Sequence, residues 1–258
     1  MKKLFATLVC LAPLWAFAQT PFDGTWVAKI DSAQLPKKPE VFSLNQGMYR
    51  CSTCTPKIEV KADGQEQKVS GDPYSDSLSV RVVDAATVEF SAQKDGKVVE
   101  TDSEMVSPDG NTLTDKFTDL SGTQPVTGEW IYSRVSPGEA GSHAISGSWL
   151  AIKVNRISQN GLTVTYQGTS DGLKSSSSTG QAFDAKFDGQ DYPITGDIGH
   201  SLISLRRIDD HTIESTVKRQ GKVVRVARRT VSSDGRTMAV VSNDMENGTT
   251  MSFEMEKQ

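Results

Sequence analysis

Cys51 and Cys54 form a C-x-x-C pair, a spacing that serves disulfide bonding, thiol redox chemistry or metal binding. A redox thiol needs a helix N-terminus or basic neighbours, and only Arg50 supplies a positive charge beside this pair. Zinc needs two further ligands, and none lies near in the sequence. No histidine follows Cys54 directly, which excludes a c-type haem attachment motif. The sequence therefore favours a structural disulfide, with redox or metal chemistry as alternatives.

Arg207 and Arg228 are candidate anchors for an anionic ligand. In an alternating strand Arg207 shares a face with Ile203 and Leu205, and Arg228 shares a face with two valines. If these apolar faces line the interior of a sheet, both guanidinium groups point inward and demand anionic partners such as a ligand carboxylate. The alternative is that both lie at the rim, where they reach water or pair with a carboxylate. Tyr166 is a strand aromatic that we expect to pack in the core and to line any cavity there.

Arg225 and Arg229 occupy the opposite face of the same predicted strand. The equivalent positions in the first half of the chain are Glu100 and Glu104. Oppositely charged faces could dock the two halves against each other. A solvated strand face explains the pattern equally well, since a surface ion pair contributes only about 0–1 kcal/mol.

The sequence shows no catalytic motif. His143, His200 and His211 are its three histidines, and no two of them have the spacing of metal ligands. There is no glycine-rich phosphate loop. We therefore expect no catalytic residue, no metal site and no cofactor, and binding is favoured over turnover. An enzyme that uses scattered carboxylates stays the third alternative.

A duplication organises the chain that carries these residues. The segment Gly-Lys-Val-Val at 96–99 recurs at 221–224, and the Ser-x-Asp-Gly turn at 107–110 recurs at 232–235. From Gly47 and Gly172 onward the two halves match at a constant offset of 125 residues. A match sustained over such a length indicates two copies of one unit.

Each copy predicts a run of short strands. Strand-like segments recur about every 8–12 residues, separated by Asp-Gly and related turns, which is typical of an antiparallel barrel or sandwich. We expect two up-and-down β-barrels of about eight strands each, at 19–135 and 145–258, joined by a flexible linker at 136–144. One larger barrel of about sixteen strands is the competing architecture, and the linker and the complete restart of the pattern argue against it.

The first eighteen residues have the features of a cleaved signal peptide. Lys2 and Lys3 precede an apolar run, and Ala16-Phe17-Ala18 provides a small-x-small cleavage site. We therefore expect a periplasmic or secreted protein, with no transmembrane segment in the mature chain. The net charge of −4 is too small to indicate a nucleic-acid partner. The halves differ in charge: residues 19–135 contain 12 Lys and Arg against 18 Asp and Glu, whereas residues 136–258 contain 14 of each.

Gly-x-Trp at the start of a β meander resembles the first-strand signature of lipocalins. The motif occurs at Gly24-Thr25-Trp26 and again at Gly147-Ser148-Trp149. The resemblance implies an eight-stranded barrel whose tryptophan packs at the closed end, beneath an arginine of the last strand. Arg134 has that place in the first copy, and the second copy offers Met255 or Lys257 instead. The arrangement is also similar to that of uncharacterised exported bacterial proteins with twin lipocalin-like units.

Together these features predict an exported protein that binds a small apolar or amphipathic ligand inside a β-barrel, with Arg207, Arg228 and Tyr166 as candidate ligand contacts. The alternative is a non-enzymatic interaction module of the cell envelope with solid-packed barrels. The sequence leaves the oligomeric state open.

Overall fold

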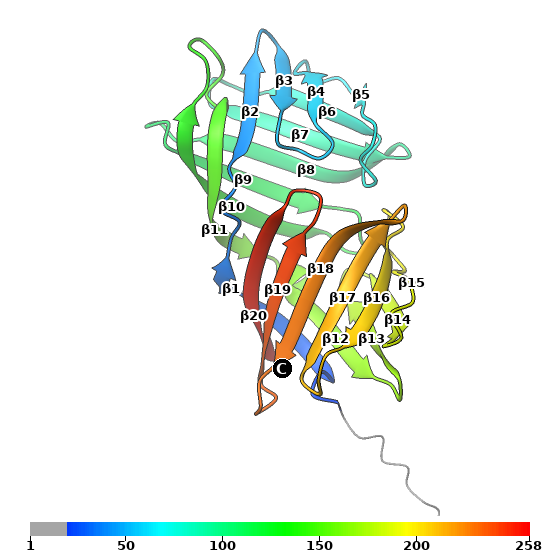
Figure 1. Ribbon diagram of the computed structural model, residues 1–258. Coiled ribbons are helices and arrows are strands. Elements are labelled where there is room, and N and C mark those ends of the chain that lie inside the picture. The colour runs from blue at the N-terminus through cyan, green and yellow to red at the C-terminus, as the bar shows by residue number, and fades with distance from the viewer. Residues whose placement is uncertain (1–19) are drawn as a thin grey trace, which may run out of the picture.

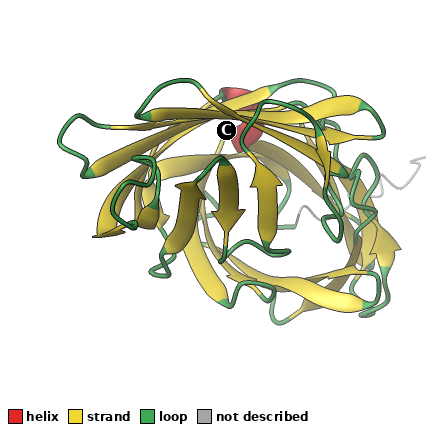
Figure 2. Cartoon of the chain, turned by 90° about the horizontal axis from the view of Figure 1, so that it is seen from above, coloured by secondary structure: helices red, strands yellow, loops and turns green. Residues whose placement is uncertain are grey.

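The computed structural model describes residues 20–258, so the signal peptide expected at 1–18 lies outside the described residues. One short helix, α1 (Gln159–Leu162), accompanies twenty strands in two antiparallel ten-stranded sheets. Each sheet curves into a nearly closed up-and-down barrel (Figure 1), and the view from above shows how strongly the strands bend (Figure 2). The expected all-β fold of two barrels is confirmed. Each sheet has ten strands rather than about eight, and one strand of each sheet has only two residues, at Gln67–Lys68 and at Tyr192–Pro193.

The first barrel contains, in spatial order, β4 (Ile58–Lys61), β3 (Met48–Cys51), β2 (Glu40–Asn45), β11 (Gly147–Ile157), β10 (Val126–Pro137), β9 (Thr112–Asp119), β8 (Lys97–Val106), β7 (Thr87–Lys94), β6 (Ser77–Val82) and β5 (Gln67–Lys68). The second contains β14 (Ala182–Lys186), β13 (Gly172–Ser177), β12 (Thr163–Gly168), β1 (Gly24–Gln34), β20 (Thr249–Lys257), β19 (Thr237–Asp244), β18 (Lys222–Val231), β17 (Thr212–Arg219), β16 (Leu202–Arg207) and β15 (Tyr192–Pro193).

The two repeats exchange their first strands. Strand β1 opens the first repeat but lies between β12 and β20 of the second barrel. Strand β11 opens the second repeat but lies between β2 and β10 of the first barrel. In Figure 1 the blue strand β1 accordingly lies beside the red strand β20, while β2 is part of the other barrel. Each barrel is therefore completed by a strand from the other repeat.

The Gly-x-Trp motifs show the consequence of this exchange. Trp26 and Trp149 are both fully buried, and each indole donates a 2.8 Å hydrogen bond to a carbonyl four residues earlier. The guanidinium carbon of Arg134 lies 3.9 Å from the ring centre of Trp149, and the ammonium of Lys257 lies 5.4 Å from that of Trp26. The resemblance pairs Arg134 with the tryptophan of its own repeat. That pairing is wrong, because β11 and not β1 borders β10.

Gly24 and Gly147 precede these tryptophans with φ angles of 120° and 138°, in the region that favours glycine. A Cβ atom at Gly24 would lie 2.7 Å from the Cε of Lys257, and one at Gly147 would collide with the carbonyl of Ser136. The glycines thus let the last strand of the other repeat approach the motif closely.

The segment expected as the linker, 136–144, joins β10 to β11, which pair with each other in the first barrel. The chain passes between the barrels elsewhere, at 35–39 and at 158–162. Each barrel has its own buried core. That residues 19–135 and 145–258 fold as separate units remains a prediction. The exchange of first strands between the repeats provides a test of it.

Cutting the chain at residue 140 and producing both pieces in one cell is expected to give a 1:1 complex. Each piece supplies an internal strand of the other's sheet, so association restores every pairing in the intact fold. Size-exclusion chromatography with light scattering measures the mass. Two stable monomers that do not associate would show instead that each piece refills its barrel with its own first strand.

Candidate functional site

A β-bulge decides which side chains face the interior of each barrel. In the first barrel Ala92 pairs with Glu100 and Gln93 pairs with Val98, so Val99 is an extra residue. An extra residue shifts the alternation of the strand beyond it by one position. As a result Val99 and Glu100 both face the interior, and so do Asp102 and Glu104 further along β8.

The second barrel repeats this bulge at the equivalent place. Val217 pairs with Arg225 and Lys218 pairs with Val223, which leaves Val224 as the extra residue. Val224 is buried and Arg225 next to it also lines the interior. Strict alternation from Val224 would place Arg228 on the interior face. Because of the bulge, the residues of β18 after Val224 have the opposite orientation, and Arg228 faces outward.

The inward orientation expected for Arg207 and Arg228 is wrong. The guanidinium of Arg228 pairs with Glu214 at 3.0 Å, and its side chain is 56% exposed. Arg207 lies at the end of β16, exposed, with its guanidinium carbon 4.6 Å from the ring centre of Phe187. Both side chains follow the alternative interpretation, in which they reach water or pair with a carboxylate.

The inward arginines of the second barrel are Arg225 and Arg229, which line a cavity of about 240 Å³. Arg229 donates a 2.9 Å hydrogen bond to the hydroxyl of the buried Ser215. Arg225 is exposed at the mouth of the cavity and Arg229 is half-buried; partial desolvation lowers the pKa of Arg225, and the nearby charge of Arg229 lowers it further. Within residues 20–258 neither guanidinium has an ion-pair partner.

Apolar side chains form the remaining wall of this cavity. Tyr166 is 6% exposed and lines it, as the sequence predicts. Phe183 and Phe253 lie on the same wall, with buried aliphatic side chains from β16 and β19. The second barrel thus combines two unpaired cations with an apolar surface.

The interior of the first barrel carries the opposite charge. Glu100, Asp102 and Glu104 follow one another along the inward face of β8, and Glu104 faces Asp115 of β9 in the register of the sheet. Glu40 of β2 completes a set of five carboxyl groups. Glu40, Glu100, Asp102 and Glu104 line a cavity of about 830 Å³. Among the described residues none of the five forms an ion pair with Lys, Arg or His.

Enclosure changes the acidity of these carboxyl groups. Burial raises the pKa of Asp102 to about 8 and that of Asp115 to about 7, and the charge of Glu100 contributes to both. Burial also raises the pKa of Glu104 well above its usual range, with Asp115 as the next cause. These groups therefore hold protons at a pH where exposed carboxylates are ionised.

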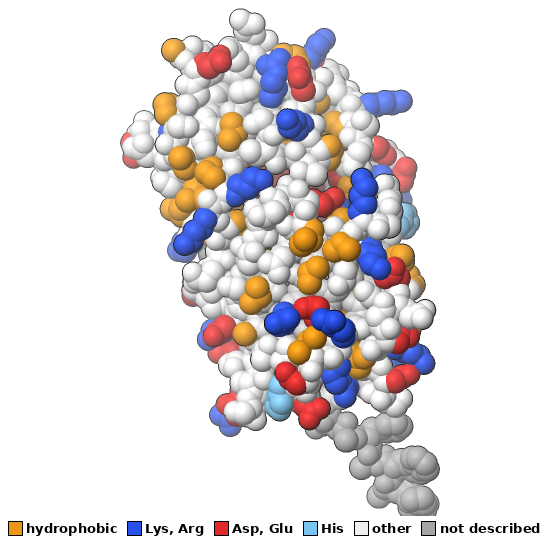
Figure 3. Space-filling view, viewed as in Figure 1, with side chains coloured by type: hydrophobic (Ala, Val, Ile, Leu, Met, Phe, Trp, Pro, Cys, Tyr) orange, Lys and Arg blue, Asp and Glu red, His pale blue; other side chains and the backbone are white. Residues whose placement is uncertain are grey.

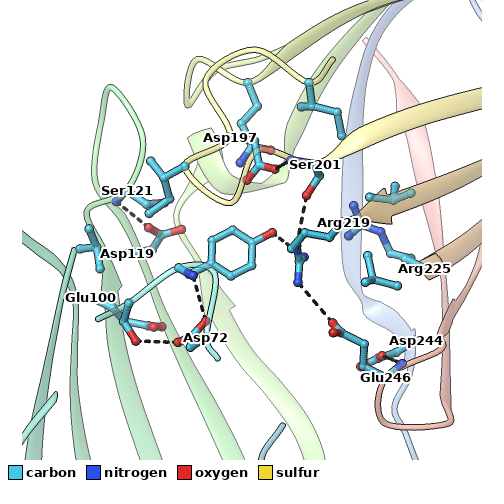
Figure 4. A pocket seen from close by; sticks show the side chains of 18 of the residues that line it. Asp72, Glu100, Asp119, Ser121, Asp197, Ser201, Arg219, Arg225, Asp244 and Glu246 are labelled. Atoms are coloured by element: carbon cyan, nitrogen blue, oxygen red, sulfur yellow. Dashed lines mark hydrogen bonds and ion pairs between the residues drawn. The ribbon is translucent and has the colours of Figure 1, made fainter. Parts of the chain in front are cut away.

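A third cavity of about 690 Å³ lies between the two barrels. Glu100 lines both this cavity and the interior of the first barrel, and Arg225 lines both this cavity and the interior of the second. Figure 4 shows the acidic residues of the first barrel on one side and Arg219 and Arg225 on the other. The mouths of the two barrels thus open toward the same space.

Contacts between the repeats cross this cavity. The guanidinium of Arg219 donates a 2.9 Å hydrogen bond to the hydroxyl of Tyr74 in the first repeat. It also pairs with Glu246 of its own repeat at 3.3 Å. Its carbon also lies 4.7 Å from the ring centre of Tyr74. By contrast, the face of the molecule in Figure 3 shows basic, acidic and apolar side chains interspersed. On this face, unlike in the two interiors, the charges are not separated.

The cysteines lie at the rim of the first barrel. Cys51, at the end of β3, is bonded to Cys54 in the turn that follows. Cys51 is buried in the core, and the backbone amide of Cys54 lies 3.0 Å from its sulfur. The described residues contain no group of three His, Cys, Asp or Glu side chains arranged to hold a metal ion.

Comparison with known protein families, with curated proteins and with solved structures finds no match to this chain. Within residues 20–258 no helix is both long and apolar enough to span a bilayer. The candidate site therefore depends on the geometry of the interiors alone.

Proposed function

We propose that the protein binds a small amphipathic molecule with an acidic head group, which enters from the cavity between the barrels and extends into the second barrel. The observation that carries this proposal is the pair of inward guanidinium groups, Arg225 and Arg229, beside an apolar wall and without a carboxylate partner. Binding without turnover is the proposed mode of action.

Charge and space support this assignment. Two arginines that line one cavity without an ion-pair partner make that cavity electropositive, and arginine binds carboxylate or phosphate groups through paired hydrogen bonds. The space between the barrels, about 690 Å³, is within the range of small-molecule sites. An acidic head group at Arg225 and Arg229 would leave its apolar part against Tyr166 and Phe253.

The proposal includes a lipocalin-like character for each barrel and export to the periplasm or beyond. The buried Gly-x-Trp motif with a cation over its indole supports the first. The Cys51–Cys54 disulfide supports the second, because such bonds persist mainly in oxidising compartments. The alternative of solid-packed barrels is less well supported, given the cavities of about 830 and 240 Å³ in the two interiors.

Decanoate is a suitable probe, with decanol as its uncharged analogue. Arg225→Gln and Arg229→Gln are each expected to weaken decanoate binding about 10- to 100-fold, since a hydrogen bond to a charged group contributes about 1.5–3 kcal/mol. Decanol binding should change far less. Isothermal titration calorimetry measures both ligands.

Arg228→Gln is the matched control, because Arg228 lies on the same strand but pairs with Glu214 on the outside. It should leave decanoate binding unchanged. An equal loss in the Arg228 and Arg225 variants, or the absence of decanoate binding to the unaltered protein, would contradict the proposal.

A further inference from the structure

The carboxyl groups inside the first barrel are not required by the fold. The second repeat has Ala227 where the first has Asp102, and Val240 where the first has Asp115, on equivalent strands of an equivalent barrel. Like charges that face each other across two strands destabilise a sheet, and Glu104 faces Asp115 in this way. A feature that costs stability and that the second copy lacks points to a role in binding.

Glu104 supplies a second, independent observation. Glu104 is half-buried and lines the cavity, and one of its carboxyl oxygens, Oε2, is inaccessible to water and has no hydrogen-bond partner in the described chain. Oδ1 of Asp115 is likewise buried and without a partner. Buried polar atoms are almost always hydrogen-bonded in folded proteins, so two unpaired carboxyl oxygens on residues paired across β8 and β9 indicate a donor that a ligand would supply.

The surroundings select the kind of donor. Tyr49 is buried and meets the ring of Phe90 edge to face, with ring centres 5.1 Å apart, and both rings line the cavity. Aromatic faces attract cations and also accept an apolar body. The volume of about 830 Å³ suits an organic molecule rather than a bare ion, and no metal-type group of ligands occurs within residues 20–258.

We propose that the first barrel is a second binding site, specific for a small organic amine whose ammonium group lies between Glu104, Asp102 and Asp115 and whose apolar part packs against Tyr49 and Phe90. This site goes beyond the proposed function, because it lies in the other barrel and takes a ligand of the opposite charge. The two sites share only the cavity between the barrels.

Protons compete with the amine for these carboxyl groups. Asp102 has a pKa of about 8 and Asp115 of about 7, so a bound ammonium group must displace protons at neutral pH. Amine affinity should therefore rise about tenfold or more between pH 6 and pH 8.5, a range in which an alkylamine stays charged. The titratable and charged groups that face Asp102 and Glu104 or line the same cavity are Glu40 of β2, Tyr49 of β3, Glu59 of β4, Lys68 of β5, Glu100 of β8, Asp115 of β9, Tyr132 of β10, Asp244 of β19, and Lys38, Lys57 and Asp72 of the connecting segments.

Calorimetric titration of the full chain with 2-phenylethylamine, hexylamine and butylamine at pH 8.5 tests the site. At least one of the three is expected to bind, whereas 2-phenylethanol should not. Glu104→Gln and Asp102→Asn should each weaken that binding at least tenfold. Glu104→Gln keeps the shape of the side chain, and its melting temperature shows whether the barrel remains folded.

Glu89→Gln is the matched control, since Glu89 lies in the same barrel but faces Arg81 on the outer surface. It should bind the amine as the unaltered protein does. Arg225→Gln should also leave amine binding intact, which separates this site from the one in the second barrel. The proposal is overturned if none of the three cations binds, or if the Glu104, Asp102 and Glu89 variants bind the amine equally.

Discussion

Replacing Trp26 with alanine is expected to destabilise the second barrel by about 3–5 kcal/mol, although Trp26 belongs to the first repeat. The indole is fully buried in the core of the second barrel, where it packs among side chains from β12 to β20. Removing it leaves a large cavity there and abolishes the contact with Lys257. The core of the first barrel contains Trp149 instead and should keep its packing.

Hydrogen exchange resolved by peptide is the measurement that locates this loss. In Trp26→Ala, amides of β12 and β20 should lose protection, while those of β2 and β10 should keep it. Trp149→Ala is the reciprocal variant, and it should affect β2 and β10. If Trp26→Ala weakened β10 instead, the first strand would belong to its own repeat in solution.

The duplication and the strands were predictable from local patterns. Turn residues such as Asp109-Gly110 and Asp234-Gly235 end one strand and begin the next, and the structure forms turns at both places. The closing of each sheet follows from the need to avoid exposed edge strands. Turns and strands depend mainly on residues that are close together in the sequence, so one sequence is enough to predict them.

The exchange of first strands was not predictable in the same way. A Gly-x-Trp strand finds nearly the same partners in either barrel, so its sequence does not say which one it completes. The connection offers one physical signal: Pro36 and Pro39 favour an extended segment between β1 and β2 over a tight hairpin. That signal disfavours a hairpin between β1 and β2, but it does not indicate with which strands β1 pairs instead.

A bulge in each barrel hides the interior charges from a simple alternation along the sequence. Counting from Val224 assigns Arg228 to the interior, whereas the extra residue brings Arg225 and Arg229 there. The same alternation assigns Glu100 and Glu104 to the outer face, whereas the bulge brings both of them and Asp102 to the interior. The excess of acidic residues in 19–135 was the available signal, since 18 Asp and Glu against 12 Lys and Arg leave carboxylates without partners.

Replacing Asp102 with asparagine is expected to make the protein more stable at pH 8 and to have little effect near pH 4. Burial raises the pKa of Asp102 to about 8, whereas the same group in the unfolded chain ionises near pH 4. Between these values the native state binds more protons than the unfolded state, so its free energy of unfolding falls as the pH rises. Asparagine does not titrate and removes this contribution.

The difference between Asp102→Asn and the unaltered protein should reach about 2 kcal/mol at pH 8, allowing for screening by water in the cavity. Urea unfolding at pH 4, 6 and 8 measures it, with Glu89→Gln as a control on the outer surface of the same barrel. If the free energies of unfolding of the Asp102 variant and of the unaltered protein changed with pH by the same amount, this carboxyl group would be ionised in the native state. Added 2-phenylethylamine should narrow the gap at pH 8, because an ammonium group stabilises the charged carboxylate that asparagine lacks.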